Sequence, residues 1–434
     1  MNSAVQQLQD EPNRVSSKPR AGDKKLSIAL LGYRCNPFSG GQGVYIRNVS
    51  AGLAELGHQV DVISGQPYPD LIEHKNIKLI KLPSLNLYGS GDEIVGYSAK
   101  RLLSFTDTFE WCSYQTGGFP EPYTFGRRVF RYLKDNHQKY DIIHDNQTLS
   151  WGIADLEQLT DKLVTTIHHP ITFDRDIALA HTQTIGLRLL VRRWHHFLNM
   201  QTKVARKLRR IITVSENSRS DIAASFASDP SAIEIIPNGI NTKLYRPLPE
   251  IKRIPGCIIT TASADQPLKG TQHLIPAIAA LRKSHPEIRL VFIGKPKEDG
   301  PTAKLIREHT LADCIEFVHG ISNQEVVRRY AQATIAVVPS EYEGFGLPAA
   351  EAMACGVPVV STNGGALAEV VGDAGLIVTK GDPQALTTAM DQLLRDAELR
   401  EAYAQKGRAH IMQHFSAPRA AELLEAYYLK VLDP

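Results

Sequence analysis

The sequence predicts an α/β protein made of two doubly wound domains, and three observations carry this prediction. First, the chain has 434 residues, which is too many for one ordinary hydrophobic core. Second, short apolar runs alternate with helical patterns from Leu26 onward, as in parallel sheets that helices cover on both faces. Third, a segment rich in proline and charge, "NTKLYRPLPEIKRIPG", interrupts this alternation before it starts again.

The two series of apolar runs place the domains. The run "LSIALLGY" is followed by "VYIRNVSAGLAELG", whose apolar residues recur at helical spacing until Gly57 ends the pattern. We expect a first domain at residues 26–244, a linker at 245–255 and a second domain at 256–410. The other expected strands are "QVDVIS", "YDIIHD", "LVTTIHH", "RIITVS" and "IEIIPNG" in the first domain, and "GCIITTAS", "IRLVFIG", "IEFVHG", "TIAVVPS", "PVVST" and "GLIVT" in the second.

Three further stretches fall outside these series. Residues 1–25 are polar and lack the apolar core of a signal peptide, so we expect a disordered tail. The stretch from about Pro83 to Pro122 is expected to be a long irregular loop, which is a common place for functional lids. Residues 411–434 are expected to form an amphipathic helix, for which packing back on the first domain is one arrangement.

Composition and charge exclude several classes of protein. A hydrophobic content of 43% and a charged content of 22% are ordinary for a globular chain. No run approaches the roughly 18–20 apolar residues that a membrane span needs. A net charge of +3 is too small to indicate a nucleic-acid partner. The five cysteines are scattered and odd in number, which favours the reducing environment of the cytoplasm.

One basic segment leaves a membrane contact open. "RLLVRRWHHFLNMQTKVARKLRR" contains Trp194 and Phe197 among its basic residues and has a helical pattern. It is either a packed helix with a solvated basic face or a helix that lies on an anionic membrane surface. The second interpretation would place the protein peripherally on the inner face of the membrane.

The most informative motif is "SEYEGFGLPAAEAMACGVPVV", which follows an expected strand. Pro348 suits the first turn of a helix, and Gly344 and Gly346 allow a close approach of the backbone to a ligand. The N-terminus of such a helix is a ready site for phosphate. Glu343 and Glu351 would then accept hydrogen bonds from hydroxyl groups on either side of that phosphate. The alternative is a capped surface helix with solvated glutamates.

Two weaker motifs lie near the ends of other expected strands. In "TTASADQPLKGTQHL", Lys269 and Gly270 precede a helix, so the lysine is either a counter-charge for phosphate or simply solvated. In "NPFSGGQGVYI", the glycines do not satisfy the dinucleotide pattern G-x-G-x-x-G. That turn either approaches a ligand or is a simple tight turn.

Histidines at strand ends are the remaining candidates. His168 ends the run "LVTTIHH" and could be a donor, a base or a contact to a sugar hydroxyl, although structural histidines are common. His144 is a similar but weaker case. The acidic triplet at Asp174 and Asp176 resembles a metal motif of some sugar transferases, but so short a match arises by chance, so we expect no metal site.

These motifs in this order resemble family 4 of the retaining glycosyltransferases, which have the GT-B fold. The resemblance extends from "SGGQGVYI" through "TTIHH", "VSENSRSDI", "IPNGIN" and the Lys269–Gly270 turn to "EYEGFGLPAAEAMACGVPVVST". It covers nearly the whole chain after the tail. It implies two Rossmann-like domains around a cleft, and transfer of a sugar from a nucleotide-diphosphate donor with retention of configuration, without a cofactor or an obligatory metal.

The resemblance also implies roles for individual residues. By position, Glu343 contacts the hydroxyls of the donor sugar, Glu351 holds the ribose, and Lys269 binds the diphosphate. His168 lies near the reacting sugar, and His168, Glu343 and Lys269 form the implied catalytic set. The implied donor-binding set is Gly40, Gly41, Ser263, Lys269, Glu343, Gly344, Phe345, Gly346, Leu347 and Glu351.

The chain departs from the family pattern at the diphosphate. The family usually has an arginine five or six residues before the lysine, where this chain has Ser263 and Ala264. Loss of one charge-assisted contact costs about 1.5–3 kcal/mol. Either Lys295 or Arg219 replaces the arginine, or Ser263 donates a hydrogen bond, or transfer is weaker.

Two alternative functions stay open from the sequence. A GT-B sugar-nucleotide epimerase would share the donor motifs, whereas a pyridoxal-phosphate phosphorylase would need a Schiff-base lysine context that is not apparent. The absence of an arginine before Lys269 supports a third possibility, a non-catalytic protein that binds a sugar nucleotide. The expected partners are a nucleotide-diphosphate sugar and an acceptor glycan or lipid, with synthesis of a glycolipid or a cell-envelope polysaccharide as the expected setting.

Overall fold

The computed structural model describes residues 24–36, 41–89, 104–180, 182 and 184–433 of the chain. Almost all of the tail expected at residues 1–25 therefore lies outside the described residues, and so does Gly40.

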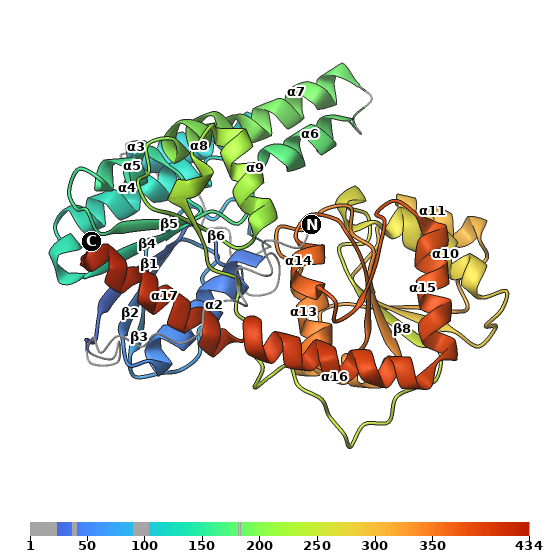
Figure 1. The fold of residues 1–434 in the computed structure, drawn as a ribbon. Helices are drawn as coiled ribbons and strands as arrows, with labels where there is room; N and C mark the ends of the chain where they lie inside the picture. The colour runs from blue at the N-terminus through green and yellow to red at the C-terminus, as the bar shows by residue number, and fades with distance from the viewer. Residues whose placement is uncertain (1–23, 37–40, 90–103, 181, 183, 434) are drawn as a thin grey trace.

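The described chain forms two parallel sheets in two separate lobes (Figure 1). The first sheet has the order β3-β2-β1-β4-β5-β6-β7 and the second has the order β10-β9-β8-β11-β12-β13. The strands are β1 Ser27–Gly32, β2 Gln59–Ser64, β3 Ile77–Lys81, β4 Ile142–Asn146, β5 Leu163–Thr166, β6 Ile211–Thr213, β7 Ile233–Ile235, β8 Cys257–Thr261, β9 Arg289–Ile293, β10 Ile315–Val318, β11 Ile335–Val338, β12 Val359–Thr362 and β13 Leu376–Val378. The predicted α/β class with two doubly wound domains is confirmed.

Helices lie between the strands and cover both sheets. Those of the first lobe are α2 Gly41–Glu55, α3 Phe105–Gln115, α4 Glu121–Lys134, η3 His137–Lys139, α5 Trp151–Leu156, α6 Thr172–Ala180, α7 Ile185–Trp194, η4 His195–Phe197, α8 Leu198–Ala205, α9 Glu216–Phe226 and η5 Pro230–Ala232. The later helices are η6 Pro267–Lys269, α10 Thr271–Leu281, α11 Pro301–Glu308, α12 Asn323–Gln332, α13 Leu347–Ala354, α14 Leu367–Val371, α15 Pro383–Arg395, α16 Ala397–His414 and α17 Ala417–Leu432. None of the described helices is long and apolar enough to cross a bilayer.

The structure corrects the expected elements at two places. Strand β3 was not expected, because its sequence "IKLIK" alternates apolar residues with lysines instead of forming an apolar run. It lies at the edge of the sheet, where one face meets solvent. The stretch after Pro83 is also not wholly irregular, because helix α3 forms there with Ser104 as its N-cap. The hydroxyl of Ser104 accepts a hydrogen bond from the backbone N–H of Asp107.

The last helix returns to the first lobe. In Figure 1, α16 runs along the second lobe, and α17 continues onto the first lobe beside α2. The return passes through Ser416, which forms a parallel bridge with Ile240. Close packing of α17 against α2 is possible because α2 has Gly52 at the contact, where an added Cβ would lie 2.8 Å from that of Ala421.

Tyr428 of α17 joins a buried hydrogen-bond chain in the first lobe. Its hydroxyl lies 2.5 Å from Nδ1 of His144 on β4, and Nε2 of His144 lies 2.6 Å from the hydroxyl of Thr166. The Thr166 hydroxyl is also 3.0 Å from that of Tyr45 on α2. Burial lowers the pKa of His144 to about 3, so this histidine is neutral. His144 is therefore enclosed in the core of the lobe.

We predict that Tyr428→Phe destabilises the protein by about 1–3 kcal/mol, because it leaves Nδ1 of a fully buried histidine without its partner. Urea denaturation followed by circular dichroism measures the effect. Tyr427→Phe is the matched control, since the Tyr427 hydroxyl forms no hydrogen bond with a described residue. Equal midpoints for the two variants would contradict the structural role of the Tyr428 hydroxyl.

Candidate active site

The lobes meet at the loop of residues 340–346, which follows β11. An added Cβ at Gly344 would lie 3.2 Å from the backbone oxygen of His168 and 3.4 Å from Nδ1 of His169. The loop therefore touches the segment that follows β5 in the other lobe. Both segments leave the carboxyl ends of parallel strands, which is where open α/β sheets bind ligands. The structure thus brings His168 and Glu343, two residues singled out from the sequence, into one region.

Glu343 and Lys269 form an ion pair in this region. Nζ of Lys269 donates to Oε1 of Glu343 at 2.7 Å, and the hydroxyl of Ser340 donates to the same oxygen at 2.9 Å. The other carboxylate oxygen of Glu343, Oε2, forms no hydrogen bond with a described residue. Glu343 can therefore accept a hydrogen bond from a ligand hydroxyl without losing either neighbour.

The turn that carries Lys269 is packed tightly against the loop. The backbone oxygen of Leu268 accepts a hydrogen bond from the N–H of Glu341 at 2.8 Å. Gly270 has φ +66°, and an added Cβ there would lie 1.8 Å from the backbone oxygen of Pro339. Only glycine combines this left-handed conformation with such a close approach. The position of Lys269 thus depends on the absence of a side chain at the next residue.

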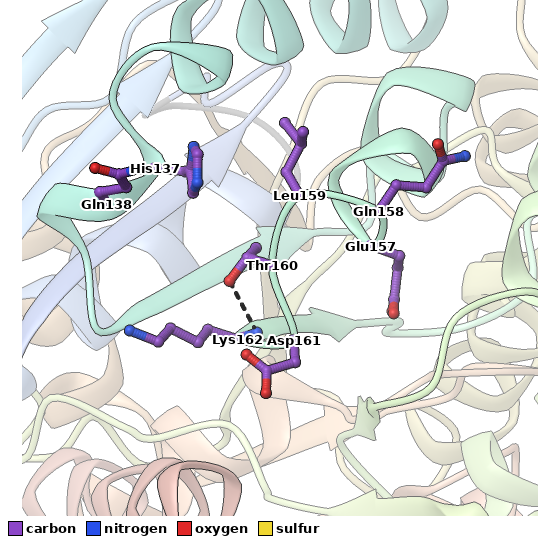
Figure 2. A pocket seen from close by; sticks show the side chains of 8 residues that line it. All are labelled: His137, Gln138, Glu157, Gln158, Leu159, Thr160, Asp161 and Lys162. Atoms are coloured by element: carbon purple, nitrogen blue, oxygen red, sulfur yellow. Dashed lines mark hydrogen bonds between the residues drawn. The ribbon is translucent and has the colours of Figure 1, made fainter.

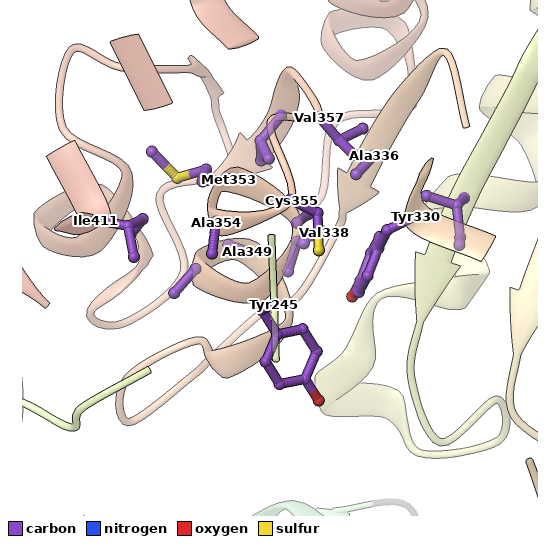
Figure 3. Close-up of a cluster of buried hydrophobic side chains, with 14 of the residues drawn as sticks. Tyr245, Tyr330, Ala336, Val338, Ala349, Met353, Ala354, Cys355, Val357 and Ile411 are labelled. Carbon is purple, nitrogen blue, oxygen red and sulfur yellow. The ribbon is translucent and has the colours of Figure 1, made fainter. Parts of the chain in front are cut away.

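Helix α13 begins directly after the loop and is anchored by small buried residues. Ala349 and Ala354 belong to the hydrophobic cluster shown in Figure 3, together with the larger Met353. Gly346, the N-cap, has φ +100° and leaves the helix start open. No described residue accepts a hydrogen bond from the backbone N–H of Gly346 or Leu347. These two N–H groups and the helix dipole are available to an anion.

Glu351 lies about one turn after the start of α13, beside two tyrosines. Burial raises the pKa of its carboxyl group to about 7, and a hydrogen bond with Tyr245 acts in the opposite direction. Burial, followed by the charge of Glu351, raises the pKa of Tyr330, whose hydroxyl lies 3.1 Å from that of Thr261 at the end of β8. Both tyrosines lie beside the α13 cluster in Figure 3. Tyr245 was not expected here, because it lies in the segment interpreted only as a linker.

His168 is held as a neutral imidazole. Its Nε2 lies 2.8 Å from Oδ1 of Asn146, and its backbone N–H donates to Oε1 of Gln147 at 2.7 Å. The ring of Tyr45 packs edge-on against it, with 4.7 Å between ring centroids. Burial, followed by the neighbouring His169 and His144, lowers the pKa of His168 to about 3. With the amide of Asn146 in this orientation, Nε2 carries the proton and Nδ1 is an acceptor.

Other residues singled out from the sequence are placed less directly. Gly41 opens α2, and an added Cβ would meet no described atom within 4 Å. Phe345 is buried and packs against Phe415, with 5.6 Å between ring centroids, so its side chain anchors the loop. Leu347 packs partly buried against the same cluster. Ser263 is exposed, and its hydroxyl forms no hydrogen bond with a described residue.

Arg219 and Lys295 were suggested as substitutes for the absent arginine, and neither forms an ion pair or hydrogen bond in the described structure that places it beside Lys269. Arg219 lies on α9, where its guanidinium pairs with Glu216 at 2.6 Å. Lys295 follows β9 and is exposed without an ion pair to a described residue. Among the described residues, the positive groups at the 340–346 loop include Lys269, the start of α13 and Lys380, whose Nζ donates to the backbone oxygen of Glu341 at 3.4 Å.

The basic segment forms α7, η4 and α8. Helix α7 extends with α6 away from the body of the first lobe (Figure 1). It exposes Arg188 and Arg192 together with the apolar side chains of Ile185, Leu187, Leu189, Leu190 and Trp194. In the triplet at the start of α6, Arg175 pairs with Asp176 at 2.7 Å. Within the described ranges, no group of three or more histidine, cysteine or acidic side chains could hold a metal ion.

A cavity elsewhere in the first lobe is not this site. It has a volume of about 470 Å³ and is lined by residues of η3 and by the segment before β5, among them Glu157 and Lys162 (Figure 2). It therefore lies at the amino ends of β4 and β5, whereas His168 follows the carboxyl end of β5. No residue singled out from the sequence lines it.

Comparison with known proteins identifies the family. Residues 39–244 match the family described as Glycosyltransferase Family 4, and residues 255–410 match Glycosyl transferases group 1. An MMP α-(1→4)-mannosyltransferase of Mycolicibacterium hassiacum is 40% identical over 410 residues, covering 94% of this chain and 98% of that relative. The chain belongs to the family 4 glycosyltransferases. The expected resemblance and the GT-B fold are both confirmed.

More distant relatives agree with this glycosyltransferase fold. A D-inositol 3-phosphate glycosyltransferase of Corynebacterium diphtheriae is 25% identical and covers 93% of this chain and 94% of its own. Sucrose-phosphate synthase from Thermosynechococcus elongatus superposes with a TM-score of 0.70 at 24% identity, over 94% of this chain and 100% of that chain. Anabaena HepE in complex with UDP and glucose gives 0.65 at 17% identity, over 93% and 99%. At these identities the solved structures show the fold alone.

We predict that Gly270→Ala destabilises the glycosyltransferase by at least about 1–3 kcal/mol and lowers its activity, because the left-handed turn before α10 and the contact with Pro339 cannot accept a Cβ. Thermal unfolding and a transfer assay measure the two effects. Gly186→Ala is the control, since an added Cβ there meets no described atom within 4 Å and alanine favours a helix. A variant with unchanged stability would contradict the tight packing of this turn.

Proposed function

We propose that this glycosyltransferase transfers mannose from a nucleotide-diphosphate donor to a hydroxyl group and forms an α-(1→4) linkage. The relative from M. hassiacum supports the sugar and the linkage, since it is 40% identical over almost the full length of both chains. The observation that carries the proposal is the meeting of Lys269, Glu343 and the start of α13 with the His168 segment. Mannose nucleotides carry their diphosphate in the α configuration, so an α product would retain it.

In the proposed mechanism, the chain binds the leaving diphosphate through fixed positive groups. Lys269 and the open N–H groups of Gly346 and Leu347 stabilise the charge that develops as the bond between the sugar C1 and the phosphate oxygen breaks. The acceptor oxygen forms its bond to C1 from the same face, and its proton passes to a phosphate oxygen. No protein base or metal ion takes part in this proposed sequence. Ser263 is exposed and lies shortly before Lys269 in the sequence, and in this proposal its hydroxyl donates a hydrogen bond to the diphosphate in place of the absent arginine.

The remaining site residues orient the donor in this proposal. Glu343 accepts a hydrogen bond from a sugar hydroxyl through Oε2, which no described residue occupies. Glu351 accepts hydrogen bonds from the ribose hydroxyls. His168 remains neutral and offers Nδ1 as an acceptor to the sugar near the reacting carbon. Gly41, at the start of α2, would lie beside the phosphates, since an added Cβ there meets no described atom within 4 Å.

The acceptor in this proposal is a glycan or polyol hydroxyl, and synthesis of a cell-envelope glycan is the setting we propose. A screen of water-soluble and lipid-linked acceptors tests that setting. The two alternative functions, an epimerase and a non-catalytic binding protein, have no support among the relatives named above.

We predict that Lys269→Ala and Glu343→Ala each reduce mannosyl transfer by about 10²–10³-fold, as expected for removal of a transition-state contact. Transfer and donor hydrolysis are measured with a panel of mannose and glucose nucleotides. The controls are Lys283→Ala and Glu308→Ala, which remove exposed side chains that form no ion pair or side-chain hydrogen bond with a described residue. Near wild-type rates in a folded Lys269 or Glu343 variant would overturn the assignment.

We predict that donor affinity rises by up to about tenfold between pH 6 and pH 8. The reason is that the carboxyl group of Glu351, with a pKa of about 7, changes from mostly protonated to mostly ionised over this range. Only the carboxylate accepts hydrogen bonds with both oxygens. Titration calorimetry with a nucleotide sugar is suitable, since its diphosphate does not titrate in this range. The rise should be absent in Glu351→Gln, and a pH dependence that persists in that variant would assign it to another group.

The same shift has a defined effect on stability. The pKa of Glu351 is raised above its unfolded value, so its contribution to the free energy of unfolding is present at low pH and is lost as the pH rises towards 7. Tyr245 and Tyr330 do not titrate in this range, because burial raises both of their pKa values further.

A further inference from the structure

The first turn of α9 in the first lobe contacts the second lobe through an unusual set of hydrogen bonds. The carboxylate of Glu369, on α14 of the second lobe, accepts from the backbone N–H groups of Glu216 and Asn217 at 2.7 and 2.8 Å. Within α9, the Ser215 hydroxyl accepts only from the N–H of Ser218. The first N–H groups of a helix have no acceptor inside the helix. Two of those in α9 are therefore satisfied by a residue of the other lobe.

The same turn also holds the 340–346 loop. The hydroxyls of Ser215 and Ser218 both donate to the backbone oxygen of Gly344, each at 3.0 Å. The hydroxyl of Tyr342 donates to Oδ2 of Asp221, one turn further along α9, at 2.7 Å. Three groups of α9 thus contact the two residues that flank Glu343.

Glu369 and the loop behave as one unit of the second lobe. The backbone oxygen of Glu343 accepts from the N–H of Ala366 at 2.9 Å. An added Cβ at Gly365 would lie 2.2 Å from that same oxygen. The start of α14, with Glu369 on it, is therefore fixed to the backbone of Glu343. A displacement of α9 from Glu369 would also remove the serine contacts from Gly344.

The charges around Glu369 indicate that its partners are the backbone N–H groups. Arg219, the nearest cation of α9, is paired with Glu216 through two contacts, at 3.1 and 2.6 Å. Glu216 carries the same sign as Glu369, so without that pair it would oppose the contact. The Arg219–Glu216 pair leaves the start of α9, with its partial positive charge, as the partner of Glu369.

We propose that Glu369 is a positioning residue that couples closure of the two lobes to donor binding. The proposal rests on the proposed function, in which Glu343 contacts the donor sugar. Glu369 and the Gly344 oxygen have these partners only while the lobes are in contact. The 340–346 loop is therefore supported from both sides only in the closed arrangement. A donor that needs Glu343 in this position binds that arrangement better than an open one and shifts the population towards it.

This coupling has a quantitative consequence. The apparent dissociation constant of a ligand increases in inverse proportion to the fraction of molecules in the binding-competent state. Removing Glu369 lowers that fraction without removing any group that touches the donor. The donor KM should therefore rise more than kcat falls, which a residue that merely stabilises the fold would not produce.

The experiment combines solution scattering with kinetics on the full chain. Glu369→Ala removes the acceptor of the two α9 N–H groups, and Ser218→Ala removes one of the two hydroxyls that donate to the Gly344 oxygen. Glu369→Gln retains one oxygen that can accept. Glu308→Ala is the control at an exposed glutamate of α11. Small-angle X-ray scattering without ligand reports the separation of the lobes. Steady-state assays with mannose nucleotides report the donor KM and kcat.

We expect Glu369→Ala and Ser218→Ala to increase the radius of gyration and to raise the donor KM by about 3–30-fold, with Glu369→Gln between Glu369→Ala and wild type. Because both sites act on the same closure, the double variant should show less than the product of the single effects. Wild-type scattering together with a wild-type donor KM in Glu369→Ala would overturn the proposal. If no nucleotide sugar supports transfer but the scattering changes, the proposed function fails and the closure contact stands.

Discussion

The contact between the 340–346 loop and its neighbours is the interaction on which the candidate site depends. On one side, the turn of Lys269 and Gly270 approaches the loop so closely that the backbone of Pro339 leaves no room for a Cβ. On the other side, Gly344 touches the backbone of His168 and receives two serine hydroxyls from α9. Small residues of α13 then bury the helix that follows the loop. Each of these contacts fixes backbone rather than side chain, so the carboxylate of Glu343 is positioned while one of its oxygens remains available to a ligand.

Much of the fold was predictable because a buried parallel strand has a strong local signal. "QVDVIS" and "TIAVVPS" are short apolar runs, and the corresponding strands β2 and β11 occur where these runs lie. Strand β3 was missed because an edge strand needs only one apolar face, which its lysines obscure. The start of α13 was also predictable, since Pro348 lies in its first turn, where a proline is favoured. These are local signals, and they identify elements without showing which of them come together.

The parts of the site that sequence reasoning missed are contacts between distant segments. Tyr245 reaches Glu351 from more than 100 positions earlier, in a segment whose proline and charge indicated only a linker. Glu369 meets α9 across 153 positions, and neither residue type is unusual where it occurs. Charge alone likewise did not identify a residue that replaces the absent arginine. Lys295 and Arg219 were reasonable substitutes by charge, but Arg219 is engaged by Glu216 and Lys295 is exposed. Charge can be read from sequence, whereas the partner that neutralises it cannot.

The return of the chain at Ser416 has a mechanical consequence. The backbone passes between the lobes once after β7 and again before α17, and the two passages are joined where Ile240 exchanges hydrogen bonds with Phe415 and Ala417 at 2.7 and 2.8 Å. A single connection would act as a swivel that allows rotation in any direction. Two connections that are hydrogen-bonded to each other act as a hinge with a defined axis. The two lobes therefore open along one path, and the same surfaces meet again when they close. Deletion of α17 would therefore remove this restriction on the motion of the lobes, as well as the packing of α17 against α2.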